Sequence, residues 1–225
     1  MPPPVVRPDV SGPAVAHPAS SSALEVKDRR RKPVSSGRGS MPGMDLSVFW
    51  ELVESTLEAG APCDRTKLLV DRLGQLPLEE VLEFQLRLDE VRAPVDTRAT
   101  VAVAKLVAPG RLSDDGLWYF HAWLVGLGQD AHRLAVDEPD ALADHPEFRR
   151  LAAETDRHLP GWETLDYCAA DAWEALTGNE DGLEEAMLAQ GHDSPLVADP
   201  DGEPWTAEQT AARLPKLTAL FPAAD

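Results

Sequence analysis

The sequence predicts an all-α protein: a single compact, multi-helix, bundle-like domain preceded by a disordered N-terminal arm. From Met44 onward, apolar residues recur at spacings of three and four almost everywhere, which is the period of an amphipathic helix. Strict alternation of apolar and polar residues, the pattern of a half-buried strand, is essentially absent. Most of the helical stretches also begin or end at residues that favour a helix terminus, which supports the same class.

Residues 1–43 form the expected arm. They contain eight prolines, seven serines and four glycines, a composition that buries too little apolar surface to offset chain entropy. The arm includes a basic run, Arg29, Arg30, Arg31 and Lys32. We interpret the run as part of a solvated tail, with a nucleic-acid or other acidic partner as the alternative. The arm also fits a sequence upstream of a true translation start at Met41 or Met44, which the intact mass of the native protein tests.

Four helices are predicted in the first half of the body. Their apolar stripes cover about 44–59, 65–73, 78–91 and 97–108. Asp45 or Ser47 can cap the first helix, and Gly60 follows its end. Asp96 is the expected cap of the fourth helix, whose valines make it the one segment where a strand competes with a helix.

The second half continues as helices of unequal length. The predicted segments are 116–127, 131–136, 141–143, 146–158, 162–177, 182–189 and a last helix that opens at Thr206. The segment 116–127 is apolar nearly all round, so we expect it in the middle of the bundle. Gly178 stops the preceding helix, Thr206 forms a capping-box pattern with Gln209, and Pro215 kinks or breaks the last helix.

Three of these segments carry a family resemblance. They are FWELVE at 49–54, DDGLWYFHAWLVGLG at 114–128 and PDALA at 139–143. Together they resemble the bacterial domain of unknown function 4240 (DUF4240), which is common in actinobacteria. The resemblance covers roughly 44–178 and makes residues 179–225 a helical extension of the 44–225 domain. It implies a small cytosolic helical domain with no established activity and transfers no catalytic residue.

The first candidate site is an acidic and aromatic cluster at the start of the most apolar helix. Its members are Asp114, Asp115, Trp118 and His121. Two carboxylates beside an imidazole can perform acid–base chemistry or hold a metal ion. The structural alternative, which we favour, is that Ser113 and both aspartates satisfy free amides while the aromatic side chains pack. Helical spacing directs His121 and Trp118 away from the face that carries Phe120 and Trp123.

No cofactor, metal or nucleophile signature appears elsewhere. The histidines form neither a His-x-x-x-His pair nor a His-Glu-x-x-His motif, and the Asp199–Glu203 segment lacks the glycine and glutamate positions of an EF-hand loop. Cys168 lies on the inner stripe of its helix, where a cysteine is typically an inert small hydrophobe. We therefore expect no catalytic residue, no metal and no cofactor.

The chain is expected to be soluble, reduced and cytoplasmic. It has no run of about 18 apolar residues that could span a membrane, and its N-terminus lacks the apolar region of a secretory signal. Its two cysteines, Cys63 and Cys168, are too few for a disulfide framework. These features exclude a membrane-spanning protein and a disulfide-rich secreted one.

Charge gives the best indication of a partner. Residues 1–43 carry a net charge of +4, and the remaining 182 residues carry 14 basic and 36 acidic groups, a net charge of −22. The acidic groups gather in three stretches, at 79–90, 137–144 and 180–185. Such a body repels phosphate backbones and attracts basic proteins. We expect a non-enzymatic protein-binding or regulatory module; the alternative is a metal- or acid–base-dependent enzyme or a small-molecule sensor that uses Asp114, Asp115 and His121.

Overall fold

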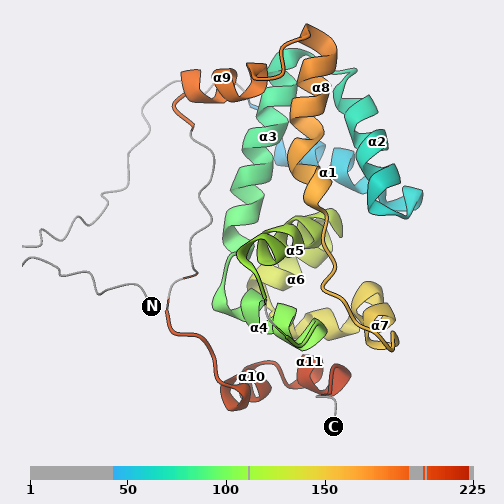
Figure 1. Ribbon diagram of the computed structural model, residues 1–225, viewed down its shortest axis with the longest axis vertical. Coiled ribbons are helices and arrows are strands. Elements are labelled where there is room, and N and C mark those ends of the chain that lie inside the picture. Colours follow the sequence, from blue (N-terminus) through green and yellow to red (C-terminus); the bar gives the residue numbers. More distant parts are fainter. Residues whose placement is uncertain (1–42, 111, 193–199, 201, 223–225) are drawn as a thin grey trace, which may run out of the picture. The chain divides into compact units, whose positions relative to one another are not determined.

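The computed structural model describes residues 43–110, 112–192, 200 and 202–222. The chain divides into two units, residues 1–39 and 40–225, and the described residues all belong to the second unit. The predicted arm therefore lies outside the described residues except for Gly43, as do its basic run Arg29–Lys32 and the start expected at Met41. Within the described part the fold is entirely helical, without a strand, so the predicted all-α class is confirmed (Figure 1).

The α-helices are α1 (Leu46–Glu54), α2 (Pro62–Leu73), α3 (Leu78–Arg92), α4 (Arg98–Val107), α5 (Asp114–Gly126), α6 (Gln129–Asp137), α7 (Pro146–Ala152), α8 (Cys168–Thr177), α9 (Gly182–Ala189), α10 (Ala207–Arg213) and α11 (Pro215–Leu220). Short 3-10 helices are η1 (Leu57–Ala59), η2 (Ala93–Val95), η3 (Pro139–Asp144) and η4 (Glu163–Tyr167). No helix among these is both long and apolar enough to cross a membrane.

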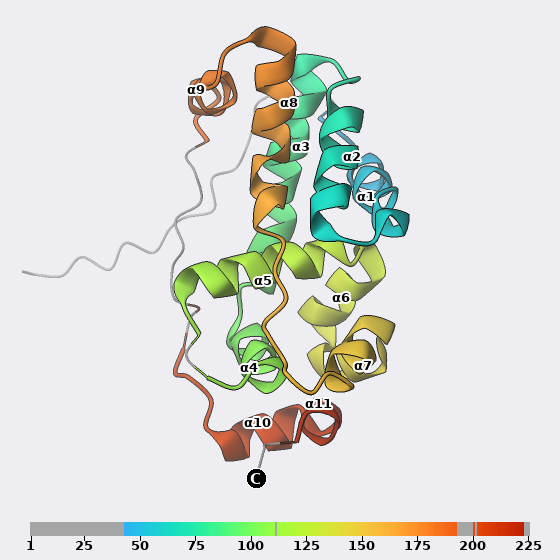
Figure 2. The same ribbon diagram turned by 45° about the vertical axis from the view of Figure 1, so that its right-hand side comes forward.

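Helix α5 separates two groups of helices in the 40–225 unit. On one side, α2 and α3 pack against α8, and α9 contacts both α3 and α8. On the other side, α4 and α6 pack against α5, and α11 packs on η3 and α4. Both views show α5 lying across the ends of α3 and α8, with α9 and α10 on opposite sides of it (Figure 2). A continuous core of buried aromatic and aliphatic side chains joins the two groups.

The central position predicted for the most apolar helix is confirmed. Seven consecutive residues of α5, Phe120–Gly126, are buried. A helix that is covered on all sides buries polar as well as apolar positions, which matters for His121 below. The terminus signals at Asp45, Gly178 and Thr206 also act as predicted, because Asp45 accepts the N–H of Ser47, Gly178 has a left-handed φ of 73°, and Thr206 forms a capping box with Gln209.

Several predicted boundaries are wrong. The segment 97–108 is helical, but Thr97 rather than Asp96 caps it, through a side chain that accepts the N–H of Thr100 at 3.2 Å. The helix predicted over 146–158 ends at Ala152, because residues 153–156 are exposed and offer no apolar face to bury. The helix predicted from Trp162 begins as η4 and becomes α8 only at Cys168.

The late start of α8 results from a contact between Trp162 and α5. Trp162 is buried, and its backbone N–H donates to the carbonyl of Tyr119 in α5 at 3.0 Å. A backbone donor that is committed to another helix in this way fixes Trp162 in a non-helical conformation, with φ −130° and ψ 67°. The apolar spacing that begins at Trp162 therefore predicts correctly that this side chain is buried, but it does not predict its backbone conformation.

Candidate functional site

The start of α5 places the predicted carboxylates at the surface. Ser113 caps the helix by accepting the N–H of Gly116 at 3.0 Å. Asp114 and Asp115 lie exposed in the first turn, where their negative charge stabilises the positive end of the helix dipole. Among the described residues Ser113 therefore accepts a free amide as predicted, whereas the aspartates act on the helix end through their charge.

His121 lies deep in the core, although helical spacing directs it away from the face that carries Phe120 and Trp123. Its side chain is 2% exposed, and neither ring nitrogen has a hydrogen-bond partner among the residues that the structure describes. Burial, and then the nearby charge of Arg92, lowers the pKa of His121 to about 4. The stretch of α5 from Phe120 to Gly126 is buried on every side, so a side chain that points away from the Phe120 and Trp123 face is enclosed as well.

The predicted cluster is therefore divided along the helix. His121 follows Asp115 by six positions, which is about 9 Å of helix axis at about 1.5 Å per residue. The carboxylates are in water while the imidazole is enclosed by the core. The described residues show no hydrogen bond or ion pair between them, and they contain no group of three or more His, Cys, Asp or Glu side chains arranged to hold a metal ion.

Trp118, the remaining member of the predicted cluster, belongs to a different polar centre. Its Nε1–H donates to Oδ2 of Asp166, which stands at the junction of η4 and α8, at 2.8 Å. The other carboxylate oxygen of Asp166 forms an ion pair with Arg92, which is 3% exposed. The guanidinium of Arg92 also lies over the Trp118 ring, 4.1 Å from its centroid. A buried arginine is thus held by one carboxylate and one indole.

A groove of about 310 Å³ opens beside this polar centre, between α3, α8 and α9. We call it the acidic groove. Four carboxylates line it: Asp89, Asp166, Glu180 and Glu184. The described lining also includes His192 but no lysine or arginine. Apolar side chains complete the walls: Tyr167, Ala170, Leu183, Met187 and Leu188.

The electrostatics of the acidic groove favour a cationic ligand. Burial raises the pKa of Asp89, although Arg92 and a hydrogen bond from Gln85 oppose that rise. Glu180 and Glu184 are exposed and form no ion pair with another described residue. Asp166 pairs with Arg92, which also acts on Asp89. A bound ammonium or guanidinium would therefore meet two unpaired carboxylates, Glu180 and Glu184, beside two that Arg92 partly offsets.

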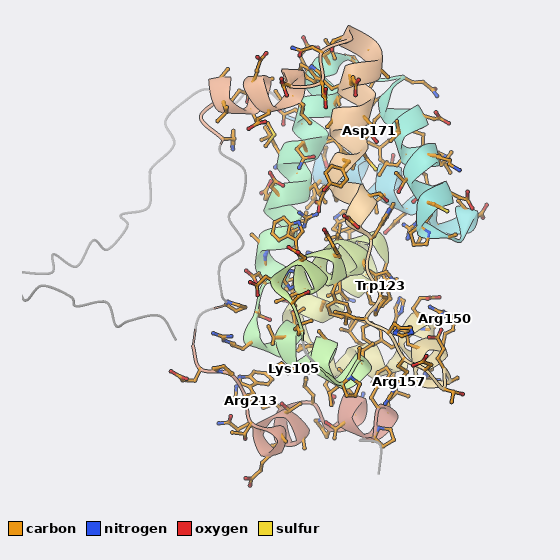
Figure 3. The ribbon with its side chains drawn as sticks, in the orientation of Figure 1. Lys105, Trp123, Arg150, Arg157, Asp171 and Arg213 are labelled. Carbon is orange, nitrogen blue, oxygen red and sulfur yellow. The ribbon has the colours of Figure 1, made fainter. Side chains whose placement is uncertain are left out.

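Further acidic side chains lie on the three helices that form the acidic groove. Asp171 lies on α8 on the opposite side of α5 from Lys105, Arg157 and Arg213 (Figure 3). Glu79 and Glu80 are exposed in the first turn of α3, and Glu185 is exposed on α9. Two of the three acidic stretches noted in the sequence, 79–90 and 180–185, thus come from helices that contact each other.

Asp89 and Asp166 are site residues that sequence reasoning missed. Asp89 was one member of an acidic stretch, and Asp166 carried no signal at all. Asp166 lies 74 residues from Arg92 and 48 from Trp118, so only the tertiary fold brings the polar centre together.

Nucleophilic chemistry has little support in the described residues. Cys168 is buried, its Sγ donates to the carbonyl of Thr164 at 3.3 Å, and burial raises the pKa of the thiol to about 12. This agrees with its interpretation as an inert core residue. Cys63 is exposed near the start of α2, away from the acidic groove lining.

One protein-family model matches the chain, over residues 44–175, and its description is "Protein of unknown function (DUF4240)". The match covers more than half of the chain and confirms the resemblance drawn from the three sequence segments. It includes α1 to α7 and most of α8, and it ends before α9, α10 and α11. No curated protein and no solved structure matches the chain.

Proposed function

The chain belongs to the DUF4240 family, and since the description of that family assigns no activity, we propose from the acidic groove that the protein is a non-enzymatic protein-binding module. Its partner is a basic, partly apolar segment of another protein. The single observation that carries the proposal is the set of uncompensated carboxylates along an apolar wall, with no basic side chain in the described lining.

Charge complementarity supports this choice of partner. A lysine or arginine in the acidic groove would donate hydrogen bonds to Asp89, Glu180 or Glu184 without first breaking an ion pair between described residues. The formal net charge of −18 would also accelerate the approach of a basic protein.

Exposed apolar side chains support the same partner. Leu188 is 54% exposed and Tyr167 is 52% exposed, and both line the acidic groove. Leu176, on α8, is 43% exposed. The aliphatic stems of lysine and arginine, together with neighbouring apolar residues, can cover these side chains while the charged ends reach the carboxylates.

The test uses the full chain and a labelled twelve-residue peptide of alternating lysine and leucine, with a glutamate–leucine peptide for comparison. Fluorescence anisotropy of the label measures affinity at low and high salt. We expect only the basic peptide to bind. The double substitution Glu180→Lys/Glu184→Lys should weaken the affinity for this peptide about tenfold or more, because two attractive charges become repulsive.

The matched control is Glu208→Lys/Glu203→Lys, which makes the same charge change at exposed positions on and before α10. We expect the affinity of this control for the basic peptide to stay within about twofold of that of the natural protein. The lower net charge alone has only this small effect, because salt screens charges that lie far from the peptide. Equal weakening by both double variants would show that the acidic groove has no special role and would contradict the proposal.

A further inference from the structure

A second cavity, of about 520 Å³, lies between α4 and the C-terminal helices α10 and α11. Its size is typical of pockets that hold small molecules, which span about 300–1,000 Å³. Eight of its twelve lining residues are apolar, two are threonines and two are cations. No acidic side chain is among the described residues that line it. We call this cavity the C-terminal pocket.

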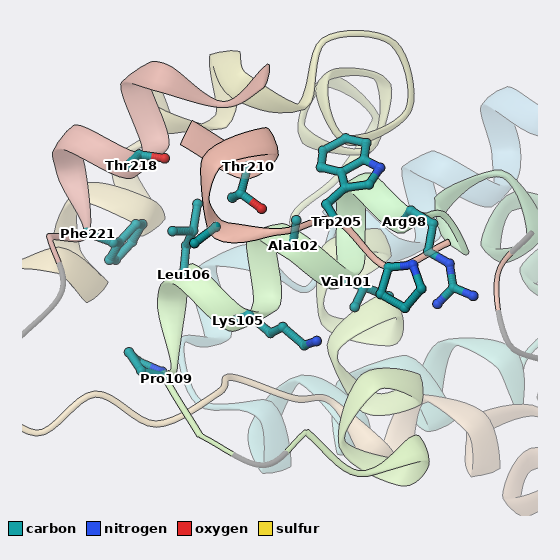
Figure 4. Close-up of a pocket in the computed structure, with 12 residues that line it drawn as sticks. Arg98, Val101, Ala102, Lys105, Leu106, Pro109, Trp205, Thr210, Thr218 and Phe221 are labelled. Atoms are coloured by element: carbon teal, nitrogen blue, oxygen red, sulfur yellow. The ribbon is translucent and has the colours of Figure 1, made fainter. Parts of the chain in front are cut away.

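The C-terminal pocket is polarised along its length. Arg98 and Lys105, both on α4, supply its positive charges, and neither forms an ion pair with another described residue. In Figure 4 the Lys105 side chain extends toward the end that carries Arg98, whereas Leu106, Pro109 and Phe221 lie toward the other end. One end of the C-terminal pocket is therefore cationic and the other is apolar.

The contacts that hold the walls of the C-terminal pocket in place leave its positive charges available to a ligand. Arg98 donates from Nε to the carbonyl of Gly202 at 2.8 Å, which leaves its two terminal nitrogens for a ligand. Trp205 forms part of the wall, and Arg213 stacks over its ring at 4.5 Å. Thr218 adds a buried hydroxyl that has no hydrogen-bond partner among the described residues.

We propose that the C-terminal pocket binds a monomeric single-chain amphiphile with an anionic head, of the fatty-acid class. The carboxylate lies between Arg98 and Lys105, and the hydrocarbon chain lies along Leu106 and Phe221. A neutral chain would leave both cations without a counter-charge, and an ion without a chain would leave the apolar walls in water. The site is distinct from the acidic groove and does not depend on the proposed partner.

The C-terminal pocket combines residues from inside and outside the family match. Arg98, Lys105 and Leu106 lie inside the family match, whereas Trp205, Thr218 and Phe221 lie beyond it. The cavity therefore exists only where the α10–α11 segment covers α4. The family description does not assign such a site.

Isothermal titration calorimetry of the full chain with sodium decanoate, kept below its micelle concentration, tests the proposal. Decan-1-ol and decyltrimethylammonium are titrated in parallel, since they keep the chain but remove or reverse the head charge. We expect decanoate to bind with one-to-one stoichiometry and each comparison ligand to bind at least about tenfold more weakly, a difference of about 1.4 kcal/mol.

Two variants locate the binding. Lys105→Glu reverses an exposed charge at the cationic end, and we expect it to weaken decanoate at least about tenfold. Lys67→Glu makes the same charge change on α2, outside the C-terminal pocket lining, and should change affinity less than about twofold. Val101→Trp fills the cavity from α4 and should abolish binding without altering the charge.

Three results would overturn the proposal. These are no saturable decanoate binding, equal affinity for the three ligands, or equal weakening by Lys105→Glu and Lys67→Glu. Co-sedimentation with phosphatidylglycerol vesicles distinguishes binding of a free amphiphile from binding to a membrane surface. Co-sedimentation with vesicles in a protein that does not bind decanoate would assign the cations to a lipid surface instead.

Discussion

Gly126, at the last position of α5, is in direct contact with the indole of Trp162. A Cβ added at Gly126 would lie 2.8 Å from Cζ3 of that ring and even closer to Cε3. Arg65 holds the ring and the glycine together, because it stacks 4.1 Å from the ring centroid and donates from Nη2 to the Gly126 carbonyl at 2.7 Å. Its Nε donates to Thr56 at 3.0 Å, and burial lowers its pKa to about 10.

Gly126→Ala should therefore destabilise the protein by about 1–3 kcal/mol through overpacking, although alanine is the better helix former. Urea unfolding followed by circular dichroism measures the change. Trp162→Leu should destabilise the protein by itself but relieve the clash, so the double variant should be more stable than the sum of the two single changes predicts. Strict additivity would mean that the ring does not oppose a side chain at Gly126.

His121 makes a second prediction at the residue scale. Its pKa is about 4 in the folded protein against an ordinary 6.5, so the unfolded chain binds more protons between these values. Above about pH 6.5 His121 is neutral in both states, and its shifted pKa does not reduce the stability of the folded protein. As the pH falls from 6.5 to 4, the unfolded chain takes up a proton that the folded protein does not, so the free energy of unfolding decreases. Full expression of this shift would lower the free energy of unfolding by about 3 kcal/mol.

Denaturant unfolding of the natural protein and of His121→Leu, at pH 7 and pH 4, checks this sign. We expect the natural protein to lose more stability on acidification than the variant. Burial also lowers the pKa values of His132 and His145, but both residues are present in each protein and cancel in the comparison. Parallel loss of stability in the two proteins would contradict the assignment.

At the scale of the element, Thr97 determines where α4 begins. Thr97→Ala removes the side-chain acceptor for the N–H of Thr100 and should cost about 1 kcal/mol of stability. Thr97→Ser keeps the hydroxyl and should recover most of that loss. Thermal unfolding of the two variants beside the natural protein measures both changes, and equal losses would show that the hydroxyl is not the capping group.

Sequence patterns predict these elements well where local chemistry decides the outcome. Helix α9 was predicted at its observed bounds, Gly182–Ala189, and the Thr206 capping box formed as expected. Prediction failed where a distant contact overrode the local pattern. Trp162 has helical apolar spacing, yet its N–H is bonded to Tyr119 in another helix. The burial of His121 likewise depends on distant segments, because α3, α4, α6 and η4 all pack against α5.

At the scale of the whole described unit, the sites themselves were the least predictable feature. The composition predicted an acidic body and a basic partner, but not that Asp89 and Glu184 would share one groove. The C-terminal pocket is lined by residues more than 90 positions apart, such as Lys105 and Thr218. Single-sequence patterns describe local periodicity, so they contain no information about which distant surfaces meet.

The two sites are also separated in character. The acidic groove is formed by α3, α8 and α9, whereas the cations of the C-terminal pocket belong to α4, on the other side of α5. An acidic chain that concentrates uncompensated positive charge in one cavity gives that cavity an ionic preference opposite to the rest of its surface.

The placement of the indoles gives each site its own optical signal. Trp205 forms part of the C-terminal pocket wall, beneath the guanidinium of Arg213. Trp118 is bonded through Nε1 to Asp166, which lines the acidic groove. A ligand that changes the polarity around either ring will shift its emission wavelength, because excited indoles respond to nearby charge and water. The molecule thus carries one intrinsic chromophore for each of the two proposed binding sites.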